Sequence, residues 1–393
     1  MNIGRAIAAV VVTLAAVGAV LACGDTRLAF DAPAGADHPD AGDAGAFEPP
    51  SGSADAGTVG AASGVYLLHA ASFPAFRLCF ERYPELRPQP DQTVMPRANV
   101  VGVEVGSVVR IGSLERPPGK VFVIMQRKLP AAPGDTGGRP CGELLASGDL
   151  TPNLEYHEAG ELTEPLGVGH VSVLGITGCG GKAILDSLEI PSSNCGAGWD
   201  VTAGSLRTRT LTLVPSVPAT RSSLPVQVVH MSPLLESTRG QNEHIEVSFG
   251  ALVASAGRLA QDVVSAPPLF EASAPVALTL DQTSEATYGT HGFRIAVQSV
   301  DDGAPPSFTV TQSLAEIQEL SSPQTVPTTY YLAASNYVLL LLGDPQITRT
   351  LPDGGTNGDY DRRRAVHLLA VPVKDTTDAG EPTALDDASA SER

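Results

Sequence analysis

The chain has 393 residues, a formal net charge of −18 from 25 Lys and Arg against 43 Asp and Glu, and 42% hydrophobic residues. Charged residues are only 17%, and 40 Gly and 32 Pro interrupt the chain, which excludes a charge-rich coiled coil. The acidic balance argues against a nucleic-acid partner, because neutralising phosphates requires clustered Lys and Arg.

The first 22 residues have the character of an export signal. Arg5 is followed by apolar or small residues up to Ala22, a stretch typical of a secretory signal rather than a membrane span. The sequence Val-Leu-Ala-Cys-Gly at 20–24 resembles a bacterial lipobox, in which the cysteine becomes the lipidated N-terminus. The alternative is an ordinary cleaved signal followed by an incidental cysteine. We therefore expect a signal peptide over 1–22 and lipidation of Cys23, which would anchor the chain durably to a membrane.

Two acidic segments flank the region that can fold. Residues 23–62 and 374–393 are rich in Ala, Gly, Asp, Pro and Ser and have few side chains to bury. Such composition predicts a disordered tether before the folded region and a disordered tail after it.

Four cysteines remain besides Cys23. An even number in an exported chain predicts two disulfides, and four cysteines allow three pairings. We favour Cys179 with Cys195, which close a short loop rich in Gly, Ser and Asn, and Cys79 with Cys141. The chain has no C-x-x-C, so a thiolate zinc site has little support.

Between the acidic segments, β signals dominate. Short runs of β-branched and aromatic residues alternate with Gly, Pro, Asn and Asp turns, as at 65–68, 121–124, 293–297 and 307–310. Helical periodicity is confined to 180–188 and 313–320. This pattern predicts an all-β fold built from sandwiches. Trp199 is expected in the core.

A weak internal repeat divides the β-rich region. The segment VYLLH at 65–69 matches VQVVH at 226–230, and each is followed by a Ser, a Pro and an alternating strand. On those strands the apolar residues at 76, 78 and 80, and at 245, 247 and 249, share one face, so we expect the opposite face to be in water. Later glycine-bounded strands recur in the same order, ending at Gly178 and at Gly343. We therefore predict two tandem β-sandwich domains, at 63–218 and 224–373.

The repeated strand-His-x-Ser-Pro pattern resembles a bacterial secreted domain-of-unknown-function family that is marked by a strand-His-Ala-Ser-Pro motif, here in two divergent copies. The first copy has one extra residue before Pro74, and the second has Met231 where the family has Ala. The resemblance implies immunoglobulin-like sandwiches at the cell envelope. It implies no activity and supplies no catalytic residue.

The two motif histidines admit two interpretations. Each imidazole could cap neighbouring backbone groups or bind a ligand. Their recurrence favours the structural interpretation, because two copies need the same turn more often than the same chemistry. His69 and His230 also belong to separate predicted domains, so a shared site cannot be assumed.

Two other segments contain candidate binding motifs, one for a dinucleotide and one for a metal ion. Residues 178–183 fit a dinucleotide-binding spacing, but no βαβ units surround them and the second copy lacks the motif, so no cofactor is expected. The loop at 353–361 places the oxygen-bearing side chains Asp353, Asn357, Asp359 and Asp361 on a Gly-rich segment, which makes it a weak Ca²⁺ candidate. The alternative is a polar hairpin loop. The adjacent Arg362-Arg363-Arg364 is interpreted as a solvated strand edge, and the alternative is a site for an anion or a lipid head group.

The sequence favours a non-enzymatic protein. It contains no G-x-S-x-G, S-x-x-K or H-E-x-x-H motif. We expect a lipoprotein of the bacterial cell envelope, at the outer membrane or cell surface, with a binding, adhesion or structural role toward an unknown envelope or extracellular ligand. The alternatives are an exported hydrolase with its site in the sandwich loops and a calcium-dependent surface module.

Overall fold

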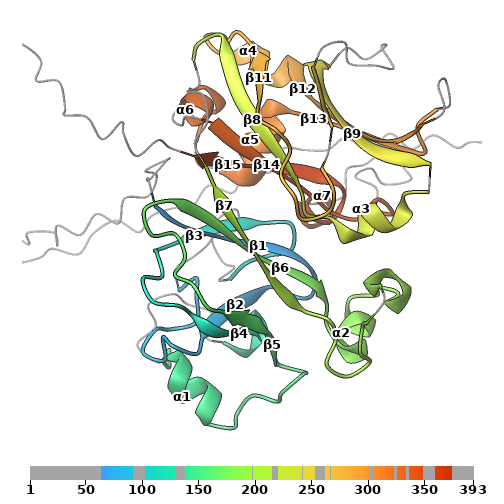
Figure 1. The fold of residues 1–393 in the computed structure, drawn as a ribbon. Helices are drawn as coiled ribbons and strands as arrows, with labels where there is room; N and C mark the ends of the chain where they lie inside the picture. The colour runs from blue at the N-terminus through green and yellow to red at the C-terminus, as the bar shows by residue number, and fades with distance from the viewer. Residues whose placement is uncertain are drawn as a thin grey trace, which may run out of the picture. The chain divides into compact units, whose positions relative to one another are not determined.

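The protein is all-β in the computed structural model (Figure 1). The structure describes residues 63–91, 102–129, 138–196, 198–214, 220–240, 242–252, 262–265, 267–300, 305–322, 325–332, 336–347 and 359–373. The chain divides into the unit Met1–Ala54 and the compact unit Asp55–Arg393, and all described residues lie in the second. The predicted export signal, Cys23, and the predicted tether and tail lie outside the described residues. Among the described helices, none is long and apolar enough to cross a membrane.

The first half of the described region forms two sheets. The larger sheet has the order β3 (Val108–Ile111), β1 (Gly64–Ser72), β6 (Val171–Cys179) and β7 (Arg207–Leu213). The smaller has the order β2 (Phe76–Phe80), β4 (Gly119–Met125) and β5 (Tyr156–Leu162). Apolar side chains from both sheets form one core between them, so this half is a β-sandwich.

The second half repeats this arrangement. One sheet has the order β11 (Val276–Thr279), β8 (Ser223–His230), β14 (Asn336–Leu342) and β15 (His367–Val373). The other has the order β10 (Asp262–Ser265), β9 (Glu243–Ala251), β12 (His291–Ser299) and β13 (Phe308–Ser313). A second core lies between these sheets. The predicted all-β class with two tandem sandwiches is therefore present.

The internal repeat is visible in the strand pairing. The strand carrying the first motif histidine, β1, pairs in parallel with β6, and β8 pairs in parallel with β14. β6 and β14 then each pair antiparallel with the next strand, β7 or β15. The glycines that end the two parallel partners, Gly178 and Gly343, have positive φ values of 90° and 101°. The matching strands and glycines of the two sequence repeats therefore lie at corresponding positions in the two sandwiches.

Helices are short and more numerous than predicted. The two expected ones are α2 (Lys182–Ser187) and α5 (Leu314–Ser321), and a capping box between Ser313 and Glu316 begins α5. The others are α1 (Cys141–Ala146), α3 (Pro233–Thr238), α4 (Glu285–Thr290), α6 (Pro327–Leu332) and α7 (Asp359–Arg364), with the 3₁₀ turns η1 (Gln126–Lys128) and η2 (Ser192–Cys195). A six-residue helix is too short for the periodicity that identifies helices in a sequence.

The strand β2 corrects the expectation that its second face is in water. Phe76, Leu78 and Phe80 face the core as predicted, but Arg77 and Cys79 are also buried. Helix α1 covers this outer face, and Cys79, Cys141 and Leu144 belong to one apolar cluster there. Alternation in β2 therefore identified the inner face but not the helix that packs on the outer one.

The two sandwiches pack against each other through the sheet of β1 and β6 and the sheet of β8, β14 and β15. In Figure 1, the sheet containing β1 and β6 lies between the small sheet of β2, β4 and β5 and the strands β8, β14 and β15. One apolar cluster draws members from both halves: Leu68, Val171, Val173 and Leu213 from the first, and Val229, Met231, Leu320, Val338, Leu340, Leu342, Leu369, Val371 and Val373 from the second. All seven residues of β14 and of β15 are consequently buried.

Candidate functional site

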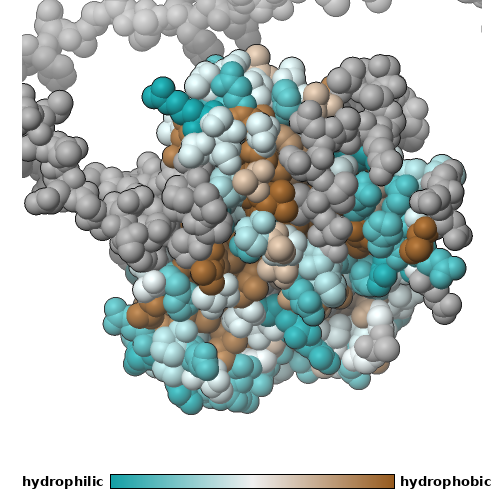
Figure 2. Space-filling model, turned by 45° about the horizontal axis from the view of Figure 1, so that its top comes forward, coloured by the Kyte–Doolittle hydropathy of each residue, from teal (hydrophilic) through white to brown (hydrophobic). Residues whose placement is uncertain are grey.

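A pocket opens at the junction of the two sandwiches, and the space between and in front of its walls, open solvent included, is about 580 Å³. Its walls come from the end of β1, the segment before β3, the disulfide loop after β6, the turn after β8, the end of β14 with the residues after it, and the end of α7. The lining residues are His69, Ala70, Ala71, Ser72, Phe73, Val105, Gly106, Leu188, Ile190, Met231, Ser232, Pro233, Leu234, Leu342, Gly343, Asp344, Ile347, Arg363 and Arg364. Most of them are apolar. Figure 2 shows hydrophobic residues toward the middle of one face and hydrophilic residues around it.

His69 is a fully buried residue of β1, and its two ring nitrogens both face backbone groups. Its Nε2 lies 3.2 Å from the carbonyl oxygen of Pro74, and its Nδ1 accepts a hydrogen bond of 3.3 Å from the amide of Ala71. These partners define a neutral tautomer in which Nε2 carries the proton. Burial lowers the pKa of His69 to about 4, although hydrogen bonds to backbone carbonyls partly oppose this shift.

The second motif builds a comparable turn with different contacts. The Nε2 of His230 lies 3.0 Å from the carbonyl oxygen of Ser232, and burial lowers the pKa of His230 while the nearby Glu236 opposes that shift. The Ser232 hydroxyl caps α3 by accepting from the amide of Leu235 at 3.0 Å, and it donates to the carbonyl oxygen of Gly343 at 2.5 Å. The structural interpretation of both histidines therefore has a geometric basis in the backbone groups they face.

The structure brings the two motif turns to one pocket. Residues 69–73 of the first repeat and 231–234 of the second line it together, although the sequence analysis kept them in separate domains. Met231, the departure from the family motif, reaches across the junction: a Cβ placed on Gly175 of β6 would lie 2.9 Å from its methyl carbon. The sequence offered two signals, the large Met231 directly after the second histidine and the small Gly175 in a strand of the first repeat. The sequence alone does not show that these two residues meet.

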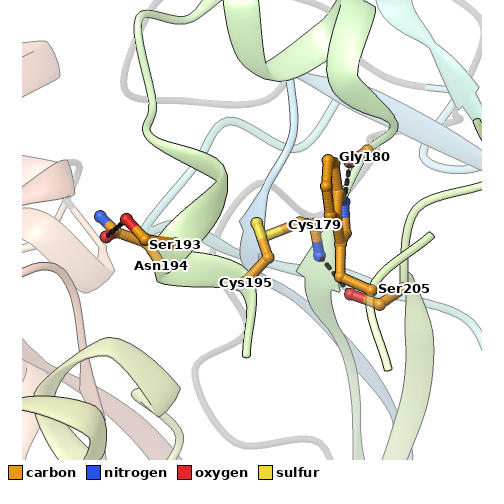
Figure 3. Close-up of a disulfide and its surroundings, with 7 residues drawn as sticks. Cys179, Gly180, Ser193, Asn194, Cys195 and Ser205 are labelled. Carbon is orange, nitrogen blue, oxygen red and sulfur yellow. Dashed lines mark hydrogen bonds between the residues drawn. A yellow bond between two sulfur atoms is a disulfide. The ribbon is translucent and has the colours of Figure 1, made fainter. Parts of the chain in front are cut away.

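Both predicted disulfides are present, Cys79–Cys141 and Cys179–Cys195. The loop closed by Cys179 and Cys195 carries Leu188 and Ile190 to the pocket wall. Figure 3 shows the bridge with Ser205 beside it, whose hydroxyl accepts a 3.3 Å hydrogen bond from the Cys179 amide. This disulfide therefore holds one side of the candidate site.

Backbone hydrogen bonds attach the same loop to the first motif turn. The Gly180 amide donates to the carbonyl oxygen of Ser72 at 3.1 Å. Trp199 is only partly buried, contrary to the expectation of a core position, and its indole Nε1 donates to the Gly180 carbonyl oxygen at 2.8 Å. This hydrogen bond attaches the Trp199 ring to the backbone beside the Cys179–Cys195 bridge.

The arginine run corrects the prediction of a solvated strand edge. Arg362, Arg363 and Arg364 form the last turn of α7, and the Arg363 side chain is 3% exposed. Arg363 Nη1 donates to the hydroxyl of Ser107 at 3.1 Å and to the carbonyl oxygen of Leu320 at 3.2 Å, so it joins the two halves. Arg362 instead pairs with Glu319 at 3.4 Å. Arg363 is buried where the first sandwich packs over it, whereas Arg362 and Arg364 are half-buried.

The calcium candidate is only partly within the described residues. Asp353 and Asn357 lie outside them, while the backbones of Asp359 and Asp361 lie in helix α7 rather than in a hairpin loop. Among the described residues, no group of three or more His, Cys, Asp or Glu side chains is arranged to hold a metal ion. Calcium binding by this segment stays a prediction.

Acidification is expected to destabilise the protein through His69. Between pH 6.5 and about pH 4, unfolded chains bind a proton at this histidine that folded chains do not, so stability falls as pH falls. A shift of this size corresponds to about 3 kcal/mol lost by pH 4. Measured by urea unfolding across this range, the free energy of unfolding should depend less steeply on pH in His69→Gln than in the wild type. Glutamine is chosen because it keeps an amide donor near Pro74. The exposed His244→Gln is the control, and an unchanged slope in His69→Gln would refute this assignment.

Comparison with known proteins leaves the family open. No protein-family model matches the chain, and no curated protein matches it. A solved structure from Bacteroides thetaiotaomicron, described as "putative polysaccharide binding proteins (DUF1812)", is similar with a TM-score of 0.19 and 10% sequence identity, over 72% of this chain and 92% of that chain. A similarity this weak carries no argument about fold or ligand. The resemblance to the His-Ala-Ser-Pro family stays a prediction.

Proposed function

We propose that this protein is a cell-envelope lipoprotein, anchored through Cys23, that holds an envelope or extracellular ligand without chemical turnover. The export signal, the lipobox and the acidic tether support the location. The pocket between the two sandwiches is the proposed binding site. Pockets at the interface of two domains are common ligand sites, because both partners contribute walls.

One observation carries the choice of binding over catalysis. The pocket-lining His69 and Ser232 are the residue types that a hydrolase would use as base and nucleophile. Here the His69 nitrogens face the Pro74 carbonyl and the Ala71 amide, and the Ser232 hydroxyl both accepts from and donates to the backbone. Using either group for catalysis would break the turn that forms the pocket wall. The hydrolase alternative gains no support from this geometry.

Filling the pocket should abolish binding. Leu234, half-buried on α3, lines the pocket, so Leu234→Trp places a larger ring in it. The probe is a mixture of bacterial envelope lipid extract and soluble peptidoglycan fragments, incubated with the soluble chain lacking residues 1–23. This truncation leaves the compact unit intact. Native mass spectrometry should detect a bound molecule in the wild type and at least tenfold less of that complex in Leu234→Trp. The molecule recovered from the wild type should have an unchanged mass.

The matched control is Leu332→Trp, the same change at a 41% exposed position on α6 that does not line the pocket. It should bind as the wild type does. Equal binding by Leu234→Trp and the wild type would exclude this pocket as the site. Conversion of the bound molecule into a product of different mass would favour the exported hydrolase.

A further inference from the structure

We infer that the outer edge of β7, the edge turned away from β6, pairs with an extended acidic segment of a partner polypeptide, which adds to the sheet as a further strand. The site lies outside the pocket of the proposed function, which β7 does not line. Three features of this edge support the pairing: unpaired backbone groups, hollows beside the strand, and the charges of its side chains.

The last strands of the two repeats, β7 and β15, end their sheets in the same way, but side chains close the edge of β15. The Leu368 amide donates to Gln312 Oε1 at 2.7 Å, and the Leu368 carbonyl oxygen accepts from Gln312 Nε2 at 3.2 Å. The Ala370 amide donates to the Ser321 hydroxyl at 2.8 Å, and its carbonyl oxygen accepts from the Tyr330 hydroxyl at 2.6 Å. A further strand would have to break these bonds.

The corresponding edge of β7 has no such cover. Counted from the glycines that end β6 and β14, Thr208 and Thr210 occupy the places of Leu368 and Ala370. Within the part of the chain that the structure describes, no group outside the sheet bonds the amide or the carbonyl oxygen of Thr208, Thr210 or Thr212. Thr210 and Thr212 are exposed, and Thr208 is half-buried. The edge is therefore open to another chain.

The hydrogen-bonding pattern shows that these groups point away from β6. The amide of Ser205, two residues before β7, donates to the carbonyl oxygen of Cys179 at 2.8 Å, so the backbone groups of Ser205 face β6. Such groups alternate between the two sides of an antiparallel strand, and the register of β6 with β7 is unbroken. The amides and carbonyl oxygens of Thr208, Thr210 and Thr212 thus form a row to which an extended chain can bond.

Two adjoining hollows lie along this edge. Together they follow β7 from Leu206 to Leu211, and Glu161 and Thr208 line both of them. The neighbouring strand β5 contributes to each hollow, and Phe270 of the second sandwich contributes to one. An added strand would therefore contact side chains on both of its faces as well as the backbone of β7. Backbone pairing supplies affinity in such complexes, and the flanking side chains supply selectivity.

The side chains of β7 favour acidic residues in the partner. Arg207 and Arg209 are exposed and alternate with the threonines, so they share the face on which the Arg209 guanidinium lies 4.6 Å from the centre of the Phe270 ring. Among the described residues, neither arginine has an ion pair. Glu158 and Glu161 line the hollows from β5. Acidic side chains at alternate positions of the partner would lie beside the arginines, whereas acidic residues at the intervening positions would face carboxylates.

The acidic character of the whole protein does not oppose this selection. At physiological ionic strength, charges separated by more than about 8 Å in solvent are largely screened. The two arginines therefore act on a strand paired with β7 more strongly than the net charge of −18 does.

Fluorescence anisotropy tests the inference on the soluble chain lacking residues 1–23. The probe is a fluorescein-labelled peptide, Thr-Glu-Val-Glu-Val-Glu-Thr, with an amidated C-terminus. It should bind saturably, and the same peptide with Lys in place of Glu should bind about tenfold more weakly or less. Two further peptides carry N-methyl groups on the valine amides or on the glutamate amides. Methylation of the valines should abolish binding if the partner runs antiparallel to β7, and methylation of the glutamates if it runs parallel.

Amide hydrogen exchange adds a readout that charge attraction alone would not change. On addition of the glutamate peptide, the amides of Thr208, Thr210 and Thr212 should gain protection from exchange. The amides of Arg207 and Arg209, which point toward β6, should change little. Unchanged exchange at the three threonines in the saturated complex, or retained binding by both methylated peptides, would overturn strand pairing.

Variants of β7 test the same edge from the side of the protein. Thr210→Pro removes one outward amide, and it should lower peptide affinity about tenfold while the protein stays folded, because proline is tolerated at a sheet edge. Arg209→Gln should weaken binding by up to about fivefold, the range for an exposed ion pair. The matched control Arg221→Gln changes an exposed arginine that lines neither hollow and should bind as the wild type does. Thermal melting would verify folding, and the methylated peptides decide the question if Thr210→Pro does not fold.

The remaining outcomes identify other occupants. Binding of oligogalacturonate as tightly as the glutamate peptide would show that the edge selects negative charge rather than a strand, and would overturn the inference. A dimer in analytical ultracentrifugation that Thr210→Pro dissociates would assign the edge to a second copy instead. Leu234→Trp should leave peptide binding unchanged, because Leu234 lines the pocket and neither hollow.

Discussion

Gly106→Ala should destabilise the protein by about 3 kcal/mol or more, because the two sandwiches meet at this residue without space for a side chain. Gly106 has a φ of 65°, and a Cβ there would lie 1.8 Å from the Arg363 carbonyl oxygen and 2.8 Å from the His367 ring. Its own carbonyl oxygen lies 3.1 Å from His367 Nε2. An alanine must therefore either strain the turn or separate the sandwiches. Urea unfolding would measure the loss of stability, and small-angle X-ray scattering would show whether the two sandwiches separate.

Gly112→Ala is the matched control for this change. Gly112 follows β3 by one position, and a Cβ there would meet nothing within 4 Å. Its stability should stay within about 0.5 kcal/mol of the wild type, as for an ordinary surface substitution. Wild-type stability in Gly106→Ala would mean that the halves do not pack through this turn, and the pocket between them would lose its basis.

Removing the disulfide Cys79–Cys141 should cost about 4 kcal/mol, the largest effect expected from any covalent change in the described region. The bridge spans 62 residues, and its loss restores the conformational freedom of a loop of that length to the unfolded chain. Cys79 and Cys141 are also buried in the cluster that attaches α1 to β2, so their replacement by alanine loosens this helix. Guanidinium unfolding of Cys79→Ala/Cys141→Ala would measure the loss.

The second bridge gives an internal comparison. Cys179–Cys195 spans only 16 residues, so the same model gives about 3 kcal/mol for its removal. Because its loop carries Leu188 and Ile190, that double variant should weaken ligand binding more than Cys79→Ala/Cys141→Ala does. A smaller stability loss for the longer bridge than for the shorter one would contradict the loop-closure argument.

Much of the local structure could be predicted from the sequence because it depends on neighbours in the chain. Alternation and turn residues placed strands such as β1, β4 and β12, and the repeated His-Ser-Pro turns indicated that one arrangement occurs twice. The even cysteine count and the short loop between Cys179 and Cys195 led to both disulfides. Backbone groups close in sequence contact a ring nitrogen of each histidine, and the recurrence of the motif favoured that interpretation. The second copy is less complete, because the buried Nδ1 of His230 has no hydrogen-bond partner among the described residues.

The pocket depended on contacts between residues far apart in the sequence. Arg363 lies in a charged run whose default interpretation is exposure, yet it donates to Ser107, 256 positions earlier. Met231 meets Gly175 only because the sheet of β1 and β6 packs against the sheet of β8 and β14. A strand's pattern indicates which side is apolar, but it does not identify what covers that side. The strands, the repeat and the disulfides could be predicted from local sequence, whereas the position of the pocket follows from the packing of one repeat against the other, which involves residues far apart in the chain.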